Sequence, residues 1–491
     1  MEQYDLIVIG SGAGLNVASP FVSLGKRVAL IDDQRLGGTC LTRGCIPSKV
    51  MIHPADVIRE LQESKNVGVH GKITRVDFDL IMKRTRAIVD DGVRDIQAGV
   101  DATPNFDFYN TVGRFVDDYT LEAGGTTMTA PKIIIASGAR PTIPPIEGIE
   151  KVGYLTNRNV WQMEKPPKKL LIVGGGFVAV EFAHFFSAIG VKVEILGRNP
   201  RLIKTYDPDV SEVLKKKLSQ WMHVHTGMEV ERAEVRDGKK ILVARDTATG
   251  KKIVFKGDEI ILASGRRSNS DLLHPEKTGV NTDSRGWIVV NEHLETSKPN
   301  IWAFGDAIGK YQFRHTANYE SEVVMKNAMS DVGPVESVDY HAVPSAVFTY
   351  PQVAAVGLGE EEAKKKHQIM VGRSFYYDTA MGYAINDRDY FFKVIVEAGT
   401  RKILGASCIG PQAATLVQQV TDMMYAGNGD YIPFAYTQTI HPALSEVVIR
   451  AFGAMQPVNV EGHHHQHAHQ PTRSQRGHNR THRHDHDTHG H

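Results

Sequence analysis

Short runs of aliphatic residues, each ending in glycine or a polar residue, recur along the first part of the chain. YDLIVIG and RVALID stand near residues 5–32, and KLLIVGGG and KVEILG stand near residues 169–197. Valine, isoleucine and leucine without regular polar positions between them are typical of parallel strands that are buried on both faces of a sheet. Helix-length segments separate the strands of each pair, so the pattern predicts two βαβ units.

The pattern changes after about residue 340. There, VPSAVFTYPQVAAVG, YFFKVIVEAGTRKILGASCIG and ATLVQQVTDMMYAG predict antiparallel strands with helices appended, which together make an α+β unit. From residue 461 the chain is rich in histidine and almost free of apolar residues. This composition predicts a disordered tail over residues 461–491.

A glycine loop, VIGSGAGLNVA, follows the first strand. Gly10 and Gly12 occupy the first two positions of a dinucleotide-binding fingerprint, and Asp32 stands at the end of the next strand. Glycine lets the backbone approach a pyrophosphate at a helix N-terminus, and the acid accepts hydrogen bonds from ribose hydroxyls. Leu15 at the third position and Pro20 inside the expected helix depart from the fingerprint. The strand, loop, helix and terminal acid nevertheless predict a dinucleotide site.

The second strand pair carries a similar loop, LLIVGGGFVAVEFA, whose fingerprint positions are held by Gly174, Gly176 and Ala179. Its next strand ends in Gly197, where the first unit has Asp32. The cations Arg198, Arg201 and Lys204 follow, and they would attract a 2′-phosphate that an acid would repel. We therefore expect this site to prefer NADPH over NADH. The alternative is a basic loop that only faces solvent.

Two of the three cysteines stand close together in GGTCLTRGCIPSK. In one regular helix Cys40 and Cys45 would lie roughly 8 to 9 Å apart, beyond disulfide reach, so the backbone must bend between them if they bond. Gly44 permits a bend, and Pro47 suits the first turn of a helix whose N-terminus would lower the pKa of the Cys45 thiol. A metal site is disfavoured because no second Cys or His pair nearby completes four ligands. Inert buried cysteines are the other alternative, and we expect Cys408 to be one.

Two dinucleotide sites and a dithiol together predict an electron path from a nicotinamide through a second cofactor to a disulfide. A flavin is the expected relay, because thiols do not take hydride directly from a nicotinamide at useful rates. Cys45 would face the flavin and Cys40 would attack the substrate disulfide. TIHPALSEVV supplies His441 and Glu446, and an imidazole poised by a carboxylate would move the proton of Cys40.

The composition of the chain limits the kinds of partner that it is expected to bind. The 491 residues carry a net charge of +1 and are 41% hydrophobic, which gives no electrostatic footprint for nucleic acid. The first strand begins without a basic segment and an apolar signal region, and no run approaches the length of a membrane span. These features predict a cytoplasmic protein of several domains that acts on a small molecule. In that compartment a close cysteine pair is seldom structural.

Taken together, these segments resemble those of the pyridine nucleotide–disulfide oxidoreductases over roughly residues 4 to 455. GGTCLTRGCIPSK resembles the redox-active segment of the family, IIIASGARP and ILASGRR its two recurrent turns, NIWAFGDAIG its second flavin-contacting motif and IHPALSE its histidine–glutamate motif. The resemblance implies an α/β fold with two Rossmann-like dinucleotide-binding domains and a C-terminal α+β dimerisation domain. FAD would bind to residues 1–150 and 270–340 and NAD(P) to residues 151–269, and residues 341–460 would form the dimerisation domain.

The resemblance also implies roles for single residues. Lys49 would lie near the isoalloxazine and pair with Glu181, and Phe177 stands where many members carry a gating tyrosine. The residues expected to contact FAD are Gly10, Gly12, Gly14, Asp32, Gly38, Thr39, Lys49, Gly113, Gly138, Asp306 and Ala307. The residues expected to contact NAD(P) are Gly174, Gly176, Phe177, Ala179, Glu181, Arg198, Lys204 and Gly265.

The family is usually a homodimer, so a catalytic centre would combine Cys40 and Cys45 of one chain with His441 of the partner subunit. The CIPSK and HPALSE segments look most like those of dihydrolipoamide dehydrogenases, and some mycothione reductases carry close relatives of them. A typical dihydrolipoamide dehydrogenase has an acid at the position of Gly197 and a glycine at that of Ala179, and both departures favour NADPH-linked reductases. Mercuric reductase is disfavoured, because it carries a C-terminal vicinal cysteine pair that this chain lacks.

We therefore expect an FAD-dependent dithiol–disulfide oxidoreductase with lipoamide, free or protein-bound, as its first expected substrate. The alternative is NADPH-dependent reduction of a low-molecular-weight disulfide of the mycothione or glutathione type. A hypothesis of another class is a flavin-linked redox or metal-handling protein that acts through its tail, because neutral imidazoles at high density bind Ni, Cu or Zn weakly. The candidate ligands are His463, His464, His465, His482, His484 and His486.

Overall fold

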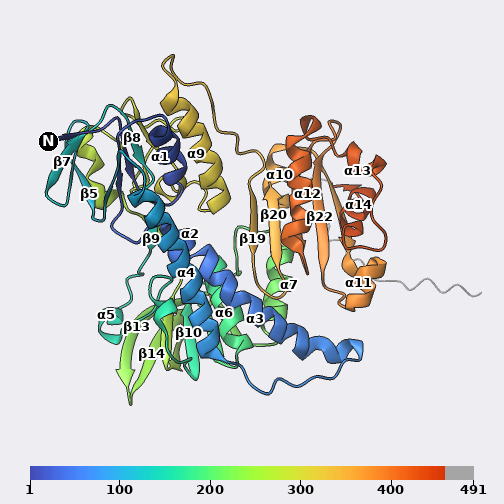
Figure 1. Ribbon diagram of the computed structural model, residues 1–491. Coiled ribbons are helices and arrows are strands. Elements are labelled where there is room, and N and C mark those ends of the chain that lie inside the picture. The colour runs from blue at the N-terminus through green and yellow to red at the C-terminus, as the bar shows by residue number, and fades with distance from the viewer. Residues whose placement is uncertain (459–491) are drawn as a thin grey trace, which may run out of the picture.

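The computed structural model describes residues 1–458, and Figure 1 shows that they form three blocks. The first block comes from residues 1–141 and 266–330, the second from residues 142–265, and the third, coloured orange to red, from residues 340–458. The predicted disordered tail and its candidate metal-ligating histidines lie outside the described residues.

The first block is built on a five-stranded parallel sheet in the order β18-β8-β2-β3-β4. Its strands are β2 (Leu6–Ile9), β3 (Val28–Ile31), β4 (Phe106–Tyr109), β8 (Ile133–Ile135) and β18 (Ile301–Ala303). The aliphatic runs in β2, β3 and β8 are buried throughout, as expected for strands covered on both faces. Helix α1 (Leu15–Ser23), which contains Pro20, packs against α9 (Arg314–Met329). The chain leaves this sheet after β8 and forms the second block. It then returns to the sheet edge, where β18 pairs with β8.

The second block repeats this arrangement with a four-stranded parallel sheet in the order β12-β11-β10-β16. Its strands are β10 (Lys169–Val173), β11 (Lys192–Gly197), β12 (His223–Thr226) and β16 (Glu259–Leu262), and its longer helices are α6 (Phe177–Ala188) and α7 (Pro208–Leu218). An antiparallel sheet of β13 (Met228–Arg236), β14 (Lys239–Asp246) and β15 (Lys252–Gly257) is attached to it. The two predicted βαβ units are therefore both present.

The third block is a six-stranded sheet in the order β19-β20-β23-β22-β21-β24, with every neighbouring pair antiparallel. Its strands are β19 (Pro344–Val347), β20 (Val353–Gly357), β21 (Ile369–Phe375), β22 (Phe391–Glu397), β23 (Ile403–Ile409) and β24 (Gln456–Pro457). Its helices are α10 (Glu360–Lys366), α11 (Ala380–Ile385), α12 (Ala413–Tyr425), α13 (Ile432–Tyr436) and α14 (Glu446–Gly453). The predicted α+β unit is confirmed, and Cys408 is fully buried in β23.

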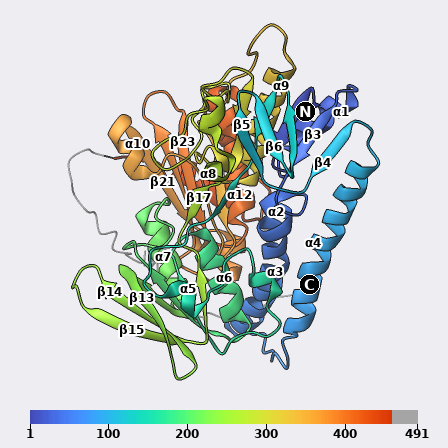
Figure 2. The same cartoon turned by 90° about the vertical axis from the view of Figure 1, so that its left-hand side faces the viewer.

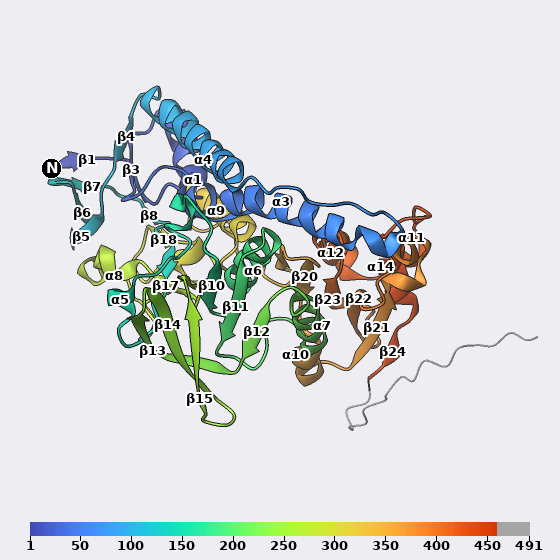
Figure 3. The same cartoon turned by 90° about the horizontal axis from the view of Figure 1, so that it is seen from below.

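Two long helices connect the blocks (Figure 3). They are α3 (Cys45–Glu63), preceded by the short α2 (Gly38–Arg43), and α4 (Phe78–Asp101), whose N-terminus is capped by Asp77. Met51 and Ile58 of α3 are buried in the same apolar cluster as Phe182 and Phe185 of α6. Each such side chain contributes roughly 1.5–3 kcal/mol when fully buried, so this cluster fixes the cysteine segment against the second block.

The remaining elements are short. They are β1 (Glu2–Gln3), β5 (Gly113–Asp117), β6 (Thr120–Ala123) and β7 (Thr126–Thr129), which form one sheet, the pair β9 (Ala139–Pro141) and β17 (Arg266–Ser268), and helices α5 (Ile149–Val152) and α8 (Ser270–Leu273). Figure 2 shows β17 close to α8, below the sheet that contains β5. Within residues 1–458 no helix is long and apolar enough to cross a membrane.

Candidate active site

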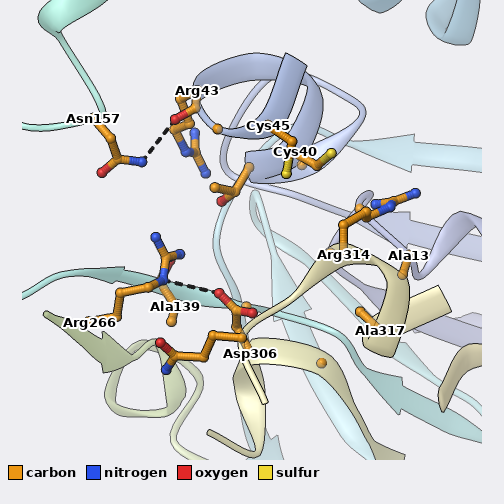
Figure 4. Close-up of a pocket in the computed structure, with 18 of the residues that line it drawn as sticks. Ala13, Cys40, Arg43, Cys45, Ala139, Asn157, Arg266, Asp306, Arg314 and Ala317 are labelled. Atoms are coloured by element: carbon orange, nitrogen blue, oxygen red, sulfur yellow. Dashed lines mark hydrogen bonds and ion pairs between the residues drawn. The ribbon is translucent and has the colours of Figure 1, made fainter. Parts of the chain in front are cut away.

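A cavity of about 1050 Å³ opens at the carboxyl ends of β2 and β3, and its wall comes from all three blocks. Figure 4 shows the part of this wall that contains the cysteine pair, Asp306 and Arg314. Of the residues expected to contact FAD, those that line this cavity are Gly10, Gly12, Asp32, Gly38, Thr39, Lys49, Gly113, Gly138 and Asp306. Gly14 and Ala307 do not line it. A Cβ atom at Gly14 would stand 2.1 Å from the Gly10 carbonyl oxygen, so this glycine permits close packing of the loop below the cavity.

Asp32 follows β3 directly and borders the cavity. Its carboxylate accepts hydrogen bonds from the Ser11 backbone (2.8 Å), the Ser11 hydroxyl (2.6 Å) and the Gln34 backbone (2.9 Å). Burial raises the pKa of Asp32, and the hydrogen bonds from Ser11 oppose that rise. Asp32 is therefore a fixed acceptor at the position that the fingerprint assigns to a ribose.

The cavity wall fits an extended dinucleotide. Gly10 has φ +107°, and a Cβ there would stand 2.1 Å from the Ala136 carbonyl oxygen, so no other residue fits this turn. Gly138 has φ +66° and nothing within 4 Å of where its Cβ would be, so its backbone borders open space in the cavity. The lining includes Asp32, Asp306 and both cysteines, so one cavity holds the predicted ribose acceptor and the predicted redox pair.

The two cysteines lie on either side of a helix break. α2 ends at Arg43, Gly44 adopts φ −138° and ψ −115°, and Cys45 is the first residue of α3. A Cβ at Gly44 would meet the Thr39 carbonyl oxygen at 2.8 Å, so glycine is required at the bend that the sequence predicted. Both thiols are free and line the cavity.

The paired thiols have different acidities. The hydrogen bond with the Cys40 thiol, and then the charge of Lys49, lower the pKa of Cys45 to about 7. The same hydrogen bond and burial raise the pKa of Cys40. Cys45 is therefore the thiolate of the pair near neutral pH, and Cys40 is the thiol.

Lys49 and Glu181 join the cysteine helix to the second block. The Lys49 Nζ atom lies 3.0 and 2.9 Å from the two carboxylate oxygens of Glu181, and the Phe348 backbone donates to the same carboxylate at 3.0 Å. The Lys49 ammonium also stands 4.3 Å from the centre of the Phe348 ring. This places a fixed cation on the cavity wall, one helical turn from Cys45.

The second glycine loop forms a separate surface. Gly174 has φ +137°, and a Cβ there would stand 2.2 Å from the Ala263 carbonyl oxygen, which is the geometry found at Gly10. Gly176 and Gly265 have nothing within 4 Å of where a Cβ atom would stand, so their backbones are open to a ligand. Phe177 lines the cavity, with its ring 5.9 Å from that of Phe313. Ala179 is fully buried inside α6 and packs the helix against its sheet.

The cations predicted for the second site are exposed on the loop after β11. Arg198 and Lys204 both face solvent, and neither lines the large cavity. Gly197 is buried, and a Cβ there would stand 3.6 Å from the Gly175 Cα atom. The end of β11 thus lies against the second glycine loop, at the position where the first unit has Asp32.

His441 and Glu446 form a pair on the third block. The His441 Nδ1 atom lies 3.0 Å from a Glu446 carboxylate oxygen, and this hydrogen bond lowers the pKa of Glu446. The His441 side chain is 70% exposed and does not line the cavity that contains the cysteines. Figure 1 shows α13 and α14, which flank His441, on the side of the third block that faces away from α2. The structure therefore does not bring His441 to the cysteines of its own chain.

Some residues of the cavity wall were missed by the sequence analysis. Arg266 pairs with Asp306 at 3.1 Å and donates to the Ala139 carbonyl oxygen (Figure 4). Its place next to Gly265 could have indicated it, because it directly follows a recurrent turn. Ser11 stands inside the first glycine loop, so its role as a hydrogen-bond donor there could have been inferred. No sequence motif around Arg314 marks it as a residue of the cavity wall. Among residues 1–458 no group of three or more His, Cys, Asp or Glu side chains could hold a metal ion.

The fold and this site define a flavin-type dithiol oxidoreductase, and comparison with known proteins gives the family. The chain belongs to the pyridine nucleotide–disulphide oxidoreductases, because residues 4–321 match the model of that family and residues 343–452 match the model of its dimerisation domain. The family uses FAD and a pyridine nucleotide, so the predicted enzyme class and fold are confirmed.

Several relatives are similar over most of the chain. Mycothione reductase of Mycobacterium tuberculosis is 35% identical over 461 residues, which cover 92% of this chain and 99% of that protein. Mercuric reductase of Lysinibacillus sphaericus is 32% identical, with 85% and 76% covered, and dihydrolipoyl dehydrogenase of Chlamydia pneumoniae is 31% identical, with 91% and 95% covered. Among solved structures, the HOCl-induced flavoprotein disulfide reductase RclA of Escherichia coli has a TM-score of 0.81 at 28% identity, with 92% and 99% covered.

Proposed function

We propose that this enzyme transfers electrons from NADPH to a low-molecular-weight disulfide. The observation that carries the choice of NADPH is the end of β11. There Gly197 lies beside the second glycine loop, at the position where the first unit has the acid Asp32, and Arg198 and Lys204 lie exposed nearby. A 2′-phosphate would gain charge-assisted hydrogen bonds there. A substrate of the mycothione type is favoured because mycothione reductase matches at 35% identity over 99% of its length. Lipoamide is the competing substrate.

The domain roles follow from the two glycine loops. The first block would hold FAD, the second block would hold the nicotinamide cofactor, and the third block would form the subunit interface. FAD, when bound, supplies a two-electron relay between NADPH and the dithiol. Lys49, held by Glu181, would orient the reacting end of the site and keep a positive charge beside the Cys45 thiolate.

The dithiol would then perform the exchange. The Cys40 sulfur attacks one sulfur of the substrate disulfide, a Cys40–substrate disulfide forms, and the substrate S–S bond breaks to release the first thiol. The Cys45 thiolate attacks Cys40, which restores the Cys40–Cys45 disulfide and releases the second thiol. One NADPH and one proton are consumed for each disulfide, and two thiols and NADP⁺ are formed.

His441 would move the protons of this exchange. It accepts the proton of Cys40 and returns it to the leaving thiolate, while Glu446 fixes the ring through Nδ1. Because His441 does not line the cavity of its own chain, we infer that it serves Cys40 and Cys45 of a second copy, with the third blocks in contact. The proposed enzyme is thus a homodimer with two shared centres.

The cofactor preference can be tested at the end of β11. We expect Arg198→Glu to lower kcat/KM for NADPH by roughly 10- to 100-fold, the value of a charge-assisted hydrogen bond, with little effect on NADH. Lys192→Glu is the matched control, because Lys192 is exposed at the opposite end of the same strand. Equal losses with both cofactors, or equal effects of both variants, would contradict the preference.

The substrate can be tested with a panel of disulfides. Lipoamide, lipoyl-protein and the disulfides of glutathione, mycothiol and coenzyme A are compared by kcat/KM with NADPH. We expect a low-molecular-weight thiol disulfide to give the highest value. A clear lead of lipoamide, together with faster NAD⁺ reduction by dihydrolipoamide, would support the competing dehydrogenase function instead.

A second candidate function is metal handling. A solved structure of RclA is described as its Cu(II) complex, and the tail of this chain is rich in histidine. The tail would collect a divalent metal ion weakly through its imidazoles. NADPH-dependent Cu(II) reduction that is lost when the chain ends at residue 458, while disulfide reduction persists, would support this function. Equal Cu(II) reduction by both chains would exclude the tail from it.

A further inference from the structure

Arg314 is the first residue of α9, and its side chain lines the cavity (Figure 4). Its Nη1 atom lies 3.6 Å from the position that a Cβ atom at Gly12 would take. Gly12 is the second glycine of the fingerprint, whose backbone approaches the diphosphate of a dinucleotide. The guanidinium therefore stands where a diphosphate would pass.

The residues beside Arg314 hold it in this position. The Phe313 ring stacks on Phe177 with centres 5.9 Å apart and on His315 with centres 5.3 Å apart. The His315 ring donates through Nε2 to the Pro344 carbonyl oxygen at 2.8 Å. Because both neighbours are anchored to the second and third blocks, Arg314 is directed into the cavity and is partly preorganised for a ligand.

The charge of Arg314 is not matched by the protein. Two other cations of the cavity wall have anionic partners: Lys49 pairs with Glu181, and Arg266 pairs with Asp306. Arg43 donates to the neutral Gln34, and Arg158 lies on the same wall without an ion pair among the described residues. Within residues 1–458, Arg314 forms no ion pair. A half-buried guanidinium without an anion is unfavourable, and a ligand that supplies one is correspondingly favoured.

The adjacent loop cannot supply this charge. Gly12 and Gly38 approach each other so closely that a Cβ at Gly38 would stand 2.6 Å from the Gly12 Cα atom. The loop therefore offers backbone N–H groups but no cationic side chain of its own. We propose that Arg314 binds the diphosphate of FAD and is a main source of flavin affinity in this chain. Guanidinium suits this role because its planar donors match phosphate oxygens.

The binding test uses apoprotein from which FAD has been removed. FAD affinity is measured by flavin fluorescence, and ADP affinity by competition at the flavin site. We expect Arg314→Ala to weaken FAD and ADP by the same factor, roughly 10- to 100-fold, and Arg314→Lys to recover part of the loss. Lys326→Ala is the matched control, because Lys326 is an exposed cation near the other end of α9.

Three outcomes would overturn the proposal. If Arg314→Ala weakened FAD but not ADP, Arg314 would act on the flavin ring. If FAD affinity were unchanged and KM for the disulfide rose, the charge would serve the substrate. Where the apoprotein does not refold, the rate of flavin release from the purified holoenzyme in rising chaotropic salt replaces the titration, and Arg314→Ala should release flavin at least about tenfold faster than Lys326→Ala. Equal release rates would also contradict the proposal.

Discussion

In the Cys45→Ser variant we expect the thiolate-to-flavin charge-transfer absorption to disappear and disulfide turnover to fall by at least about 10³-fold. The reason is the position of Cys45 at the start of α3, where Cys40 and Lys49 lower its pKa to about 7. In the wild-type enzyme reduced with NADPH, this absorption should grow as the pH rises through about 7 and vanish below it, because only the thiolate donates charge. Stopped-flow absorbance against pH measures both.

Replacement of Cys40 should affect the charge-transfer absorption and the turnover differently from replacement of Cys45. Cys40→Ala should retain the absorption but lose turnover, because the attacking sulfur is gone. It should also move the midpoint of the absorption to higher pH, since the Cys40 hydrogen bond is the largest cause of the lowered pKa of Cys45. Cys408→Ala is the control, because Cys408 is buried in β23 and hydrogen-bonds only to Tyr376 among described side chains. A midpoint that does not move would contradict the pairing of the two thiols.

The second large effect concerns His441. We expect His441→Ala to lower disulfide turnover by roughly 10²- to 10⁴-fold, the contribution of a positioned acid–base group. Reduction of the enzyme by NADPH should continue at the wild-type rate, because His441 does not line the cavity of its own chain. Single-turnover reduction and steady-state turnover, measured on the same sample, separate the two steps.

Mixing variants tests whether the centre is shared. Cys45→Ser and His441→Ala homodimers should each be inactive, but random exchange of their subunits should restore about a quarter of wild-type activity, since half of the dimers then contain one intact centre. Exchange between Cys45→Ser and a Cys45→Ser, His441→Ala double variant is the control and should restore nothing. No recovery in the first mixture would place His441 and the cysteines in a single chain and contradict the proposed homodimeric centre.

The local features of the site could be predicted from sequence because they depend on short-range sterics. Gly10 and Gly174 adopt positive φ in turns that no side chain fits, and such turns are visible as glycines after aliphatic strands. Gly44 breaks the helix between the cysteines for a similar reason. The antiparallel third block was evident from its strand and turn pattern, because each hairpin is formed by neighbouring segments.

The structure brings most of the residues expected to contact FAD to the cavity wall, but not all of them. Gly14 and Ala307 belong to the expected motifs but do not line the cavity, since a motif marks a loop and does not say which of its residues face the ligand. Ala179 likewise sits in the second fingerprint but is buried in α6.

Sequence alone thus determined the two βαβ units, the glycine turns, the bend between Cys40 and Cys45 and the helical start at Cys45, because each depends on residues near one another along the chain. The resemblance to the family already implied that Lys49 meets Glu181, whereas only the tertiary structure decided that Arg314 faces Gly12. These contacts join helices from distant parts of the sequence, and burial of apolar surface between α3 and α6, together with the return of the chain at β18, brings them together. The resemblance likewise implied that His441 serves the partner subunit, and the packing of the third block on the others is what places it outside the cavity of its own chain.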